Sequence, residues 1–509
     1  MSAIHRPLCP EGRSALRAPG LPDDKVSCPE QDRPFVLVAT ILASAMAFID
    51  GTIVTIALPA IQTDLDASFG ALQWVVNGYT LMLGALILVG GGLGDRIGRK
   101  RLFVVGIAIF ALGSAGCALA PSSETLIAAR VIKGIGAALL VPQSLAIISA
   151  SFPKEIRGRA IGTWAAASAI TTALGPPLGG FLIDTLGWRA AFWINIPLSA
   201  VAIALALRFI HENQGRSVSG RLDVLGGVMA VLGFGVLTYG LTGLTEAADG
   251  VPPQALVALA TGVALLLGFV LVERGAEDPL MPLDLFHSRV FSGLNLATLF
   301  LYGALGGVLF LLPFDLIARR GLSATEVGLT LLPLGLIIGV LSRMSGGVAD
   351  RHGPRVILTI GALIVTGAIV ILALVLDDYW LGVMLPVLIL AVGMGVVVSP
   401  LTTAIMNSVS DTRSGAASGV NNAASRIAGL IAIAGLGAVA GLVFALEGGV
   451  GTFGTLPDAS DPAHLVTEAA FLSAYATAMW LAAGSAFCAA LAASVSFIDP
   501  AQETVSDPL

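Results

Sequence analysis

Long apolar runs without Asp, Glu, Lys or Arg recur along the chain, separated by short polar segments. A helix needs ~20 apolar residues to cross a bilayer. Eleven runs meet this requirement, the last of them with Arg343 at its edge: 71–94, 102–123, 160–183, 190–207, 224–245, 251–272, 290–314, 356–376, 379–410, 469–498 and 327–342. Three more carry internal charges: 35–61, 125–152 and 414–446. The pattern predicts fourteen transmembrane helices.

Composition supports an all-α integral membrane protein. The chain is 56% hydrophobic and 12% charged, and its mean hydropathy is +0.90, which excludes a soluble globular class. Glycine strings such as "KGIGAAL" lie inside apolar spans, where glycine lets helices pack closely. No CxxC or paired histidine spacing occurs, so we expect no disulfide, no metal site and no cofactor. We expect no nucleic-acid partner.

The loops after the even-numbered spans, up to the twelfth, hold most of the loop Lys and Arg. Cytoplasmic loops retain such residues, so both termini are predicted to be cytoplasmic. Residues 1–33 are rich in proline and have no apolar core near Met1. We interpret them as a disordered cytoplasmic tail rather than a cleaved signal peptide, and 499–509 as a second tail.

One polar motif occurs twice. "GGLGDRIGRKR" follows the second span, and "GGVADRHGPR" follows the tenth. A short basic inner loop explains the arginines alone, but not an aspartate repeated at the same spacing. The repeat predicts two related six-helix bundles, 34–210 and 290–498, with two further transmembrane helices and their flanking loops inserted at 211–289. We expect a conformational gate in which the aspartates accept hydrogen bonds or meet a helix N-terminus. Its residues are Gly91, Asp95, Arg96, Gly98, Arg99, Asp350, Arg351 and Gly353.

Charges at membrane depth are candidates for chemistry. Asp50 lies fifteen residues after Phe35, about 22 Å along a helix. Arg130 and Lys133 share a face of the antiparallel fourth span at a matching depth. A nearby cation favours the carboxylate and burial favours the acid, so the group suits a proton carrier. The alternative is a static salt bridge between spans 1 and 4. Arg426 is the third buried cation, with either a structural contact or a substrate role.

Six motifs in order resemble the major facilitator superfamily, within it the fourteen-span drug:proton antiporters. They are "IDGTIVTIALPAI", "GGLGDRIGRK", "RVIKGIGAA", "GPPLGG", "GWRAAFWINIP" and "SGVNNAASRIAG". The resemblance covers residues 34–498 and implies a major facilitator fold, with Arg130 in proton coupling. Lys133 departs from the glutamine common in the family, which leaves open which cation is the partner of Asp50.

The "GPPLGG" stretch resembles the antiporter motif of span 5, with Gly175, Pro176, Gly179 and Gly180 as its residues. We expect it to let span 5 bend against the matching span of the other half. The alternative is a packing kink. In the span 13 motif, Asn421, Asn422 and Arg426 are candidates for the substrate cavity.

The leading hypothesis is a proton-coupled exporter of small amphipathic organic compounds, working by alternating access as a monomer in the lipid bilayer and driven by the proton gradient. The alternative is a proton- or ion-coupled importer of a small metabolite. An enzyme is disfavoured because no catalytic cluster is visible. Asp50 is outnumbered by Arg130, Lys133 and Arg426, so the interior charge favours neutral or weakly acidic substrates over permanent cations.

Overall fold

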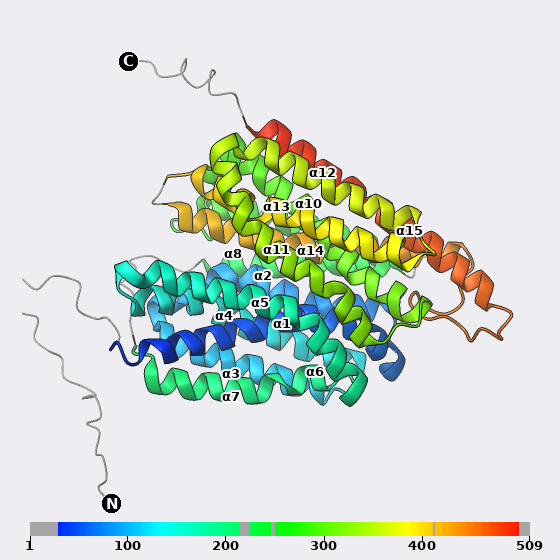
Figure 1. Ribbon diagram of the computed structural model, residues 1–509, viewed down its shortest axis with the longest axis horizontal. Helices are drawn as coiled ribbons and strands as arrows, with labels where there is room; N and C mark the ends of the chain where they lie inside the picture. Colours follow the sequence, from blue (N-terminus) through cyan, green and yellow to red (C-terminus); the bar gives the residue numbers. More distant parts are fainter. Residues whose placement is uncertain (1–28, 213–222, 246–249, 411–412, 498–509) are drawn as a thin grey trace, which may run out of the picture.

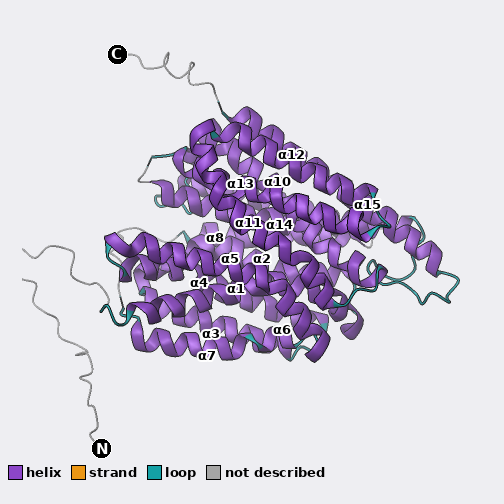
Figure 2. Ribbon diagram, viewed as in Figure 1, coloured by secondary structure: helices purple, strands orange, loops and turns teal. Residues whose placement is uncertain are grey.

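The computed structural model describes residues 29–212, 223–245, 250–410 and 413–497, without the side chains of Asp350 and His352. Within these residues every regular element is helical, and fourteen helices are long and apolar enough to cross a membrane (Figure 2). The predicted number of spans and the all-α class are therefore confirmed. The predicted tails lie almost entirely outside the described residues.

The first six spans form one bundle. Its helices are α1 (Arg33–Leu65), α2 (Phe69–Ile97), α3 (Arg99–Ala118), α4 (Ser123–Ser151), α5 (Lys154–Leu186), α6 (Ala190–Trp193) and α7 (Asn195–Phe209). The sixth span is interrupted at Ile194, which separates α6 from α7. Helix α5 begins before the predicted span, because the polar stretch after Pro153 is also helical and extends the helix toward the N-terminus.

The next two spans are α8 (Val224–Gly243) and α9 (Pro253–Gly275), which pack against each other, and α8 also contacts α2 and α14. Glycines let α8 and α9 approach closely. A Cβ on Gly262 would lie 2.6 Å from the backbone nitrogen of Leu237, and one on Gly240 would lie 2.8 Å from that of Leu259. The boundaries predicted for this inserted pair and for the two bundles stay predictions.

The last six spans form a second bundle. After a 3-10 turn, η2 (Leu283–His287), they are α10 (Arg289–Phe314) with its π-helical continuation η3 (Asp315–Arg319), α11 (Ala324–His352), α12 (Pro354–Leu374), η4 (Trp380–Met384) leading into α13 (Leu385–Asn407), α14 (Ser414–Leu446) and α15 (His464–Ser496). Figure 1 shows the two bundles lengthwise, with α2 and α5 of the first facing α11 and α14 of the second.

The bundles meet through two helix pairs, α5 with α11 and α2 with α14. By order in the repeat, α5 corresponds to α14 and α2 to α11. The expectation that span 5 packs against its counterpart is therefore wrong. A two-fold relation between the bundles explains the pairing, because it maps the α5–α11 contact onto α14–α2.

The two ends of the molecule differ. We call the end where α1 begins and α15 finishes the basic end, and the opposite one the far end. At the far end, the Phe69 ring lies 4.8 Å from Phe453 and 5.4 Å from Phe314, and Gln62 donates to the Phe453 carbonyl at 3.0 Å. The ribbons of the two bundles converge in this direction (Figure 1). The halves are thus tightly joined at the far end.

Candidate functional site

The most deeply buried charged group joins α1 to α4. Both Arg130 Nη1 and Lys133 Nζ donate to the Asp50 carboxylate, one to each oxygen. All three side chains are at most 1% exposed. The meeting predicted from helix depth is present, and the question of which cation contacts Asp50 is resolved, since both do.

Aromatic side chains and carbonyls complete this ionic cluster. Arg130 Nε donates to the Val75 carbonyl at 2.7 Å, and its guanidinium lies 4.4 Å from the Tyr79 ring centroid. Lys133 Nζ lies 4.6 Å from the ring of Phe110 and 4.9 Å from that of Phe192. Both cations therefore face π-systems where they do not face Asp50.

Sequence reasoning did not identify Tyr79, Phe110 or Phe192 as parts of this site. Their only signal is membrane depth, which many apolar residues share. The Tyr79 hydroxyl donates to the Ala47 carbonyl at 3.0 Å, so the ring that covers Arg130 is anchored to α1 as well.

With all three groups charged, one carboxylate is opposed by two cations and the cluster carries one net positive charge. Arg130 keeps its proton at any physiological pH. Removing one proton from the Asp50–Lys133 pair would leave the cluster neutral. The arrangement can therefore exchange one proton while Arg130 stays charged.

The "GPPLGG" stretch of α5 lies against the residues that follow Asp50. A Cβ on Gly175 would lie 2.5 Å from Thr52 Oγ1, and one on Gly179 would lie 2.6 Å from Ile53. A larger residue at either position would have to displace the side chain of Thr52 or Ile53 on α1.

The same stretch also faces the second bundle. A Cβ on Gly180 would lie 2.1 Å from the Ala324 carbonyl oxygen, and one on Gly328 of α11 would lie 2.3 Å from the Pro176 carbonyl oxygen. Helix α5 is therefore packed between the helix that carries Asp50 and the partner half.

Between the halves lies a cavity of about 200 Å³, bounded by α1, α5, α10 and α11. Its wall is mostly apolar, with the threonines Thr52, Thr55 and Thr172 as polar members. Thr52 and Gly51 line this cavity, whereas the neighbouring Asp50 faces α4. One turn of α1 thus carries the ionic cluster on one side and the cavity wall on the other.

The repeated loop motif forms matching turns. Gly98, between α2 and α3, and Gly353, between α11 and α12, both have positive φ, +113° and +78°, which explains glycine at both. Asp95 forms an ion pair with Arg99 at 2.8 Å, and Arg99 also donates to the Ala146 carbonyl of α4 at 3.2 Å.

The remaining gate residues are less informative. Gly91 faces Pro142 of α4, Arg96 lies in the last turn of α2, and Arg351 is exposed. The side chain of Asp350 lies outside the described residues.

At the basic end, Glu212 contacts the N-terminus of α3, a contact that was not predicted from the sequence. Glu212 accepts from the backbone nitrogens of Lys100 and Arg101 at the start of α3, at 3.1 and 3.2 Å. Asp95 does not take this place in the structure.

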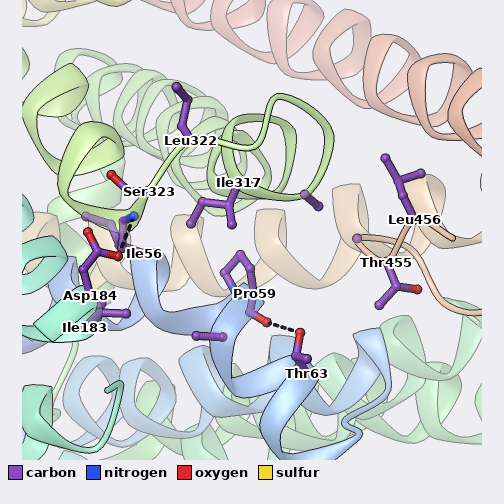
Figure 3. A pocket seen from close by; sticks show the side chains of 14 residues that line it. Ile56, Pro59, Thr63, Ile183, Asp184, Ile317, Leu322, Ser323, Thr455 and Leu456 are labelled. Carbon is purple, nitrogen blue, oxygen red and sulfur yellow. Dashed lines mark hydrogen bonds between the residues drawn. The ribbon is translucent and has the colours of Figure 1, made fainter. Parts of the chain in front are cut away.

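A cavity of about 550 Å³ at the far end lies where α1, α5 and the start of α11 meet. Figure 3 shows Asp184 at its edge, beside Ser323. The Asp184 carboxylate accepts from the backbone nitrogens of Ala324 and Thr325 at 3.1 and 2.7 Å. This carboxylate on the N-terminus of α11 is favourable for the helix dipole and bridges the two halves.

The candidates for the substrate cavity are separated in the structure. Asn421 is buried and accepts a hydrogen bond from Thr298 of α10 at 2.9 Å, whereas Asn422 is exposed. Arg426 is half-buried, and its side chain packs over Gly84 of α2. Asn421 therefore joins helices within one bundle, and Arg426 lies at the contact between bundles.

Comparison with known proteins gives a consistent result. The family model of the Major Facilitator Superfamily matches residues 40–433. The chain is 33% identical to a methylenomycin A resistance protein of Streptomyces coelicolor, covering 80% of this chain and 86% of that protein. It is 34% identical to the multidrug resistance protein Stp of Mycobacterium tuberculosis, covering 79% and 75%. It is also 34% identical to a tetracenomycin C resistance and export protein of Streptomyces glaucescens, covering 80% and 76%.

Among solved structures, the chain is similar to a bacterial homologue of the human lysosomal transporter Spinster in an inward-facing, unoccupied conformation. The TM-score is 0.68 at 18% identity, and the match covers 93% of this chain and all of that one. The POT family transporter PepTSo gives a TM-score of 0.66 at 15% identity, covering 94% of this chain and 99% of that one. These similarities concern the fold.

Proposed function

Because this chain belongs to the Major Facilitator Superfamily and is a multi-pass membrane transporter, we propose that it exports small amphipathic organic compounds in exchange for protons, by alternating access. The relatives named for antibiotic resistance and export support the export direction. On this proposal the basic end faces the cytoplasm, as the positive-inside rule predicts.

The observation that carries the proposal is the ionic cluster of Asp50, Arg130 and Lys133. A proton carrier requires a buried group that can gain and lose one proton without a large change in net charge. The cluster meets this requirement, because its net charge changes only between +1 and 0. A static salt bridge needs only one cation for one carboxylate, and a second buried cation adds a desolvation penalty without adding a pair. The excess cation favours proton exchange over a purely structural role.

Coupling between proton and substrate would pass through α1. Asp50 contacts α4, while Gly51 and Thr52, the next residues, line the cavity between the halves. A change in the ion pairs of Arg130 and Lys133 with Asp50 would shift this turn of α1 relative to α4. The close packing of Gly175 and Gly179 on Thr52 and Ile53 would transmit the shift to α5 and so to α11.

Alternating access requires that the contacts at one end can open while those at the other close. The contacts within the α5–α11 and α2–α14 pairs would open at one end and close at the other. Here the far end is joined by Asp184 and by the phenylalanines around Phe453. A transporter whose far end is joined in this way would open toward the basic end, the side from which an exporter loads.

The test uses the purified transporter in proteoliposomes with an acidic lumen and N-phenyl-1-naphthylamine as a fluorescent probe. Antiport predicts that the probe accumulates in the lumen and that adding it speeds collapse of the pH gradient, which a trapped pH dye reports. Expulsion of the probe together with protons would indicate symport, as for an importer. Probe movement that is indifferent to the gradient would contradict proton coupling.

A further inference from the structure

Arg426 is a charged side chain deep in the bundle whose charge is unmatched. It lies twelve residues after the start of α14, about 18 Å along the helix axis. Arg130 and Lys133 share Asp50, but within the described part of the chain Arg426 has neither an ion pair nor a hydrogen bond. A charge at such depth normally faces a partner or a watery cavity.

The surroundings of Arg426 place it between the two halves. Its Cβ would lie 3.0 Å from a Cβ on Gly84, so the side chain of Arg426 begins directly against α2. The charge of Arg426 acts on the hydroxyls of both Tyr79 and Tyr302. Tyr79 donates to Ala47, whereas the Tyr302 hydroxyl has no hydrogen-bond partner among the described residues. Arg426 and Tyr302 thus present unused donors from α14 and α10.

Tyr302 also connects this position to the cavity. Leu305, three residues later on the same face of α10, lines the cavity between the halves, and Leu309 follows one turn further. A ligand could therefore contact the apolar cavity wall and the Arg426–Tyr302 pair at once. The guanidinium fork matches two oxygens of a carboxylate or sulfonate in geometry and charge.

We propose that Arg426 and Tyr302 bind an acidic group of the transported compound, while its apolar body lies against Leu305 and Leu309. The substrate class is then amphipathic organic anions. Permanent cations are disfavoured, because no acidic side chain lies among the described residues of the cavity wall and Asp50 is already shared by two cations. This inference rests on the proposed function for the identity of the site as the substrate site.

A matched pair of fluorescent probes tests it. 8-Anilinonaphthalene-1-sulfonate and N-phenyl-1-naphthylamine share one aromatic skeleton, and only the first carries a sulfonate. Binding is measured at equilibrium to the full-length transporter in lipid nanodiscs, with empty nanodiscs subtracted. We expect wild type to prefer the sulfonate. Arg426→Gln should weaken sulfonate binding about 10- to 100-fold and change binding of the neutral probe less than about twofold.

Further variants separate a binding role from a structural one. Arg426→Lys should retain part of the sulfonate affinity, since it keeps the charge but loses the fork. Tyr302→Phe should lose a few-fold. Arg343→Gln, an exposed arginine on α11, should change neither probe. The melting temperature of Arg426→Gln should not fall, because glutamine keeps the Cβ and Cγ that pack over Gly84 and no ion pair is broken.

Equal loss of both probes in Arg426→Gln, or a wild type that binds the neutral probe or ethidium more tightly than the sulfonate, would overturn the proposal. So would absence of sulfonate binding by wild type. The assay needs no proton gradient. If the protein fails the proteoliposome test but binds the sulfonate in an Arg426-dependent way, antiport is refuted and the proposed binding site is retained.

Discussion

At the residue scale, Asp50 supplies the negative charge of the ionic cluster, which Arg130 and Lys133 share. Removing it leaves Arg130 and Lys133 uncompensated, a type of change that costs ~3–5 kcal/mol of stability. We therefore expect Asp50→Asn to abolish proton-driven transport and also to lower the melting temperature.

The double variant Asp50→Asn/Lys133→Gln separates these two effects. It keeps one net positive charge, as in wild type, and should melt close to wild type while still failing to couple transport to protons, because Arg130 cannot release its proton. Proteoliposome transport and scanning fluorimetry on both variants check this. Proton-driven transport by the folded double variant would rule out the carrier role of Asp50.

Lys133 leads to a second prediction. Lys133→Gln leaves an Asp50–Arg130 pair that is neutral and becomes positive when Asp50 takes a proton. The cluster thus keeps the same two charge states, and we expect proton coupling to survive. The proton is then exchanged by a carboxyl group that faces one cation instead of two, so the pH profile of transport should move. The profile is measured as initial rate against pH with the neutral probe. An unmoved profile would mean that Lys133 takes no part in proton exchange.

At the element scale, the turn between α2 and α3 is fixed to α4 by Asp95, Arg99 and the Ala146 carbonyl. Asp95→Asn keeps the shape of the turn but removes the charge that orients Arg99. We expect turnover to fall about tenfold with little change in substrate affinity, since this partly buried ion pair between neighbouring turns contributes only ~1 kcal/mol to stability. Asp350→Asn should act in the same direction because it occupies the equivalent turn.

The kcat and KM of probe transport distinguish these effects. Asp66→Asn is a matched control, because Asp66 is an exposed aspartate at the far end. Its backbone is left-handed, a conformation that asparagine also adopts. A rise in KM with kcat unchanged in Asp95→Asn would place this residue in substrate binding instead of conformational change.

The α5–α11 contact is the element-scale feature most sensitive to side-chain size. A Cβ on Gly180 would lie 2.1 Å from the Ala324 carbonyl oxygen, so Gly180→Leu cannot keep the present packing at the far end. We expect it to widen the spacing of spin labels on α5 and α11 and to reduce transport strongly. Gly162→Leu on the same helix is the control, since a Cβ there meets open space. An unchanged label distance in Gly180→Leu would contradict tight packing at this contact.

At the scale of the whole molecule, apolar run length was enough to predict fourteen spans, and the resemblance of six motifs in order was enough to predict the family. Matching helix depth and the cost of leaving a buried charge unpaired were the two signals for the meeting of Asp50 with Arg130 and Lys133. Depth does not specify how a helix is rotated, so Tyr79 and Phe110 were not identified. Nor does sequence order show which helices of two repeats touch, and span 5 was expected against the wrong partner.

The polar contacts between distant segments were also outside the reach of the sequence. Asp184 meets α11 and Glu212 meets α3 through backbone nitrogens. Any residue presents a backbone nitrogen, so no sequence motif marks these positions. Two signals for the Asp184 contact are present in the sequence. Asp184 follows the antiporter-like stretch, and Ser323 begins a span with a capping box. Together they place an acid and a helix N-terminus at the same end of the molecule.

The same contact gives a prediction for the transport cycle as a whole. If the halves alternate as rigid bodies, joining them at one end must stop transport, whereas a link inside one half must not. Asp184 and Thr325 contact each other across the halves through their side chains, so an Asp184→Cys/Thr325→Cys pair, introduced after replacing the native cysteines with serine, should form a disulfide on oxidation. We expect proton-driven probe transport to be lost under oxidation and to return with a reductant. The control pair is Gly116→Cys/Ala129→Cys, where a Cβ on Gly116 would lie 3.1 Å from that of Ala129 within the first bundle, close to disulfide geometry. Undiminished transport by a fully oxidised Asp184→Cys/Thr325→Cys protein would exclude opening of the far end as a step of the cycle.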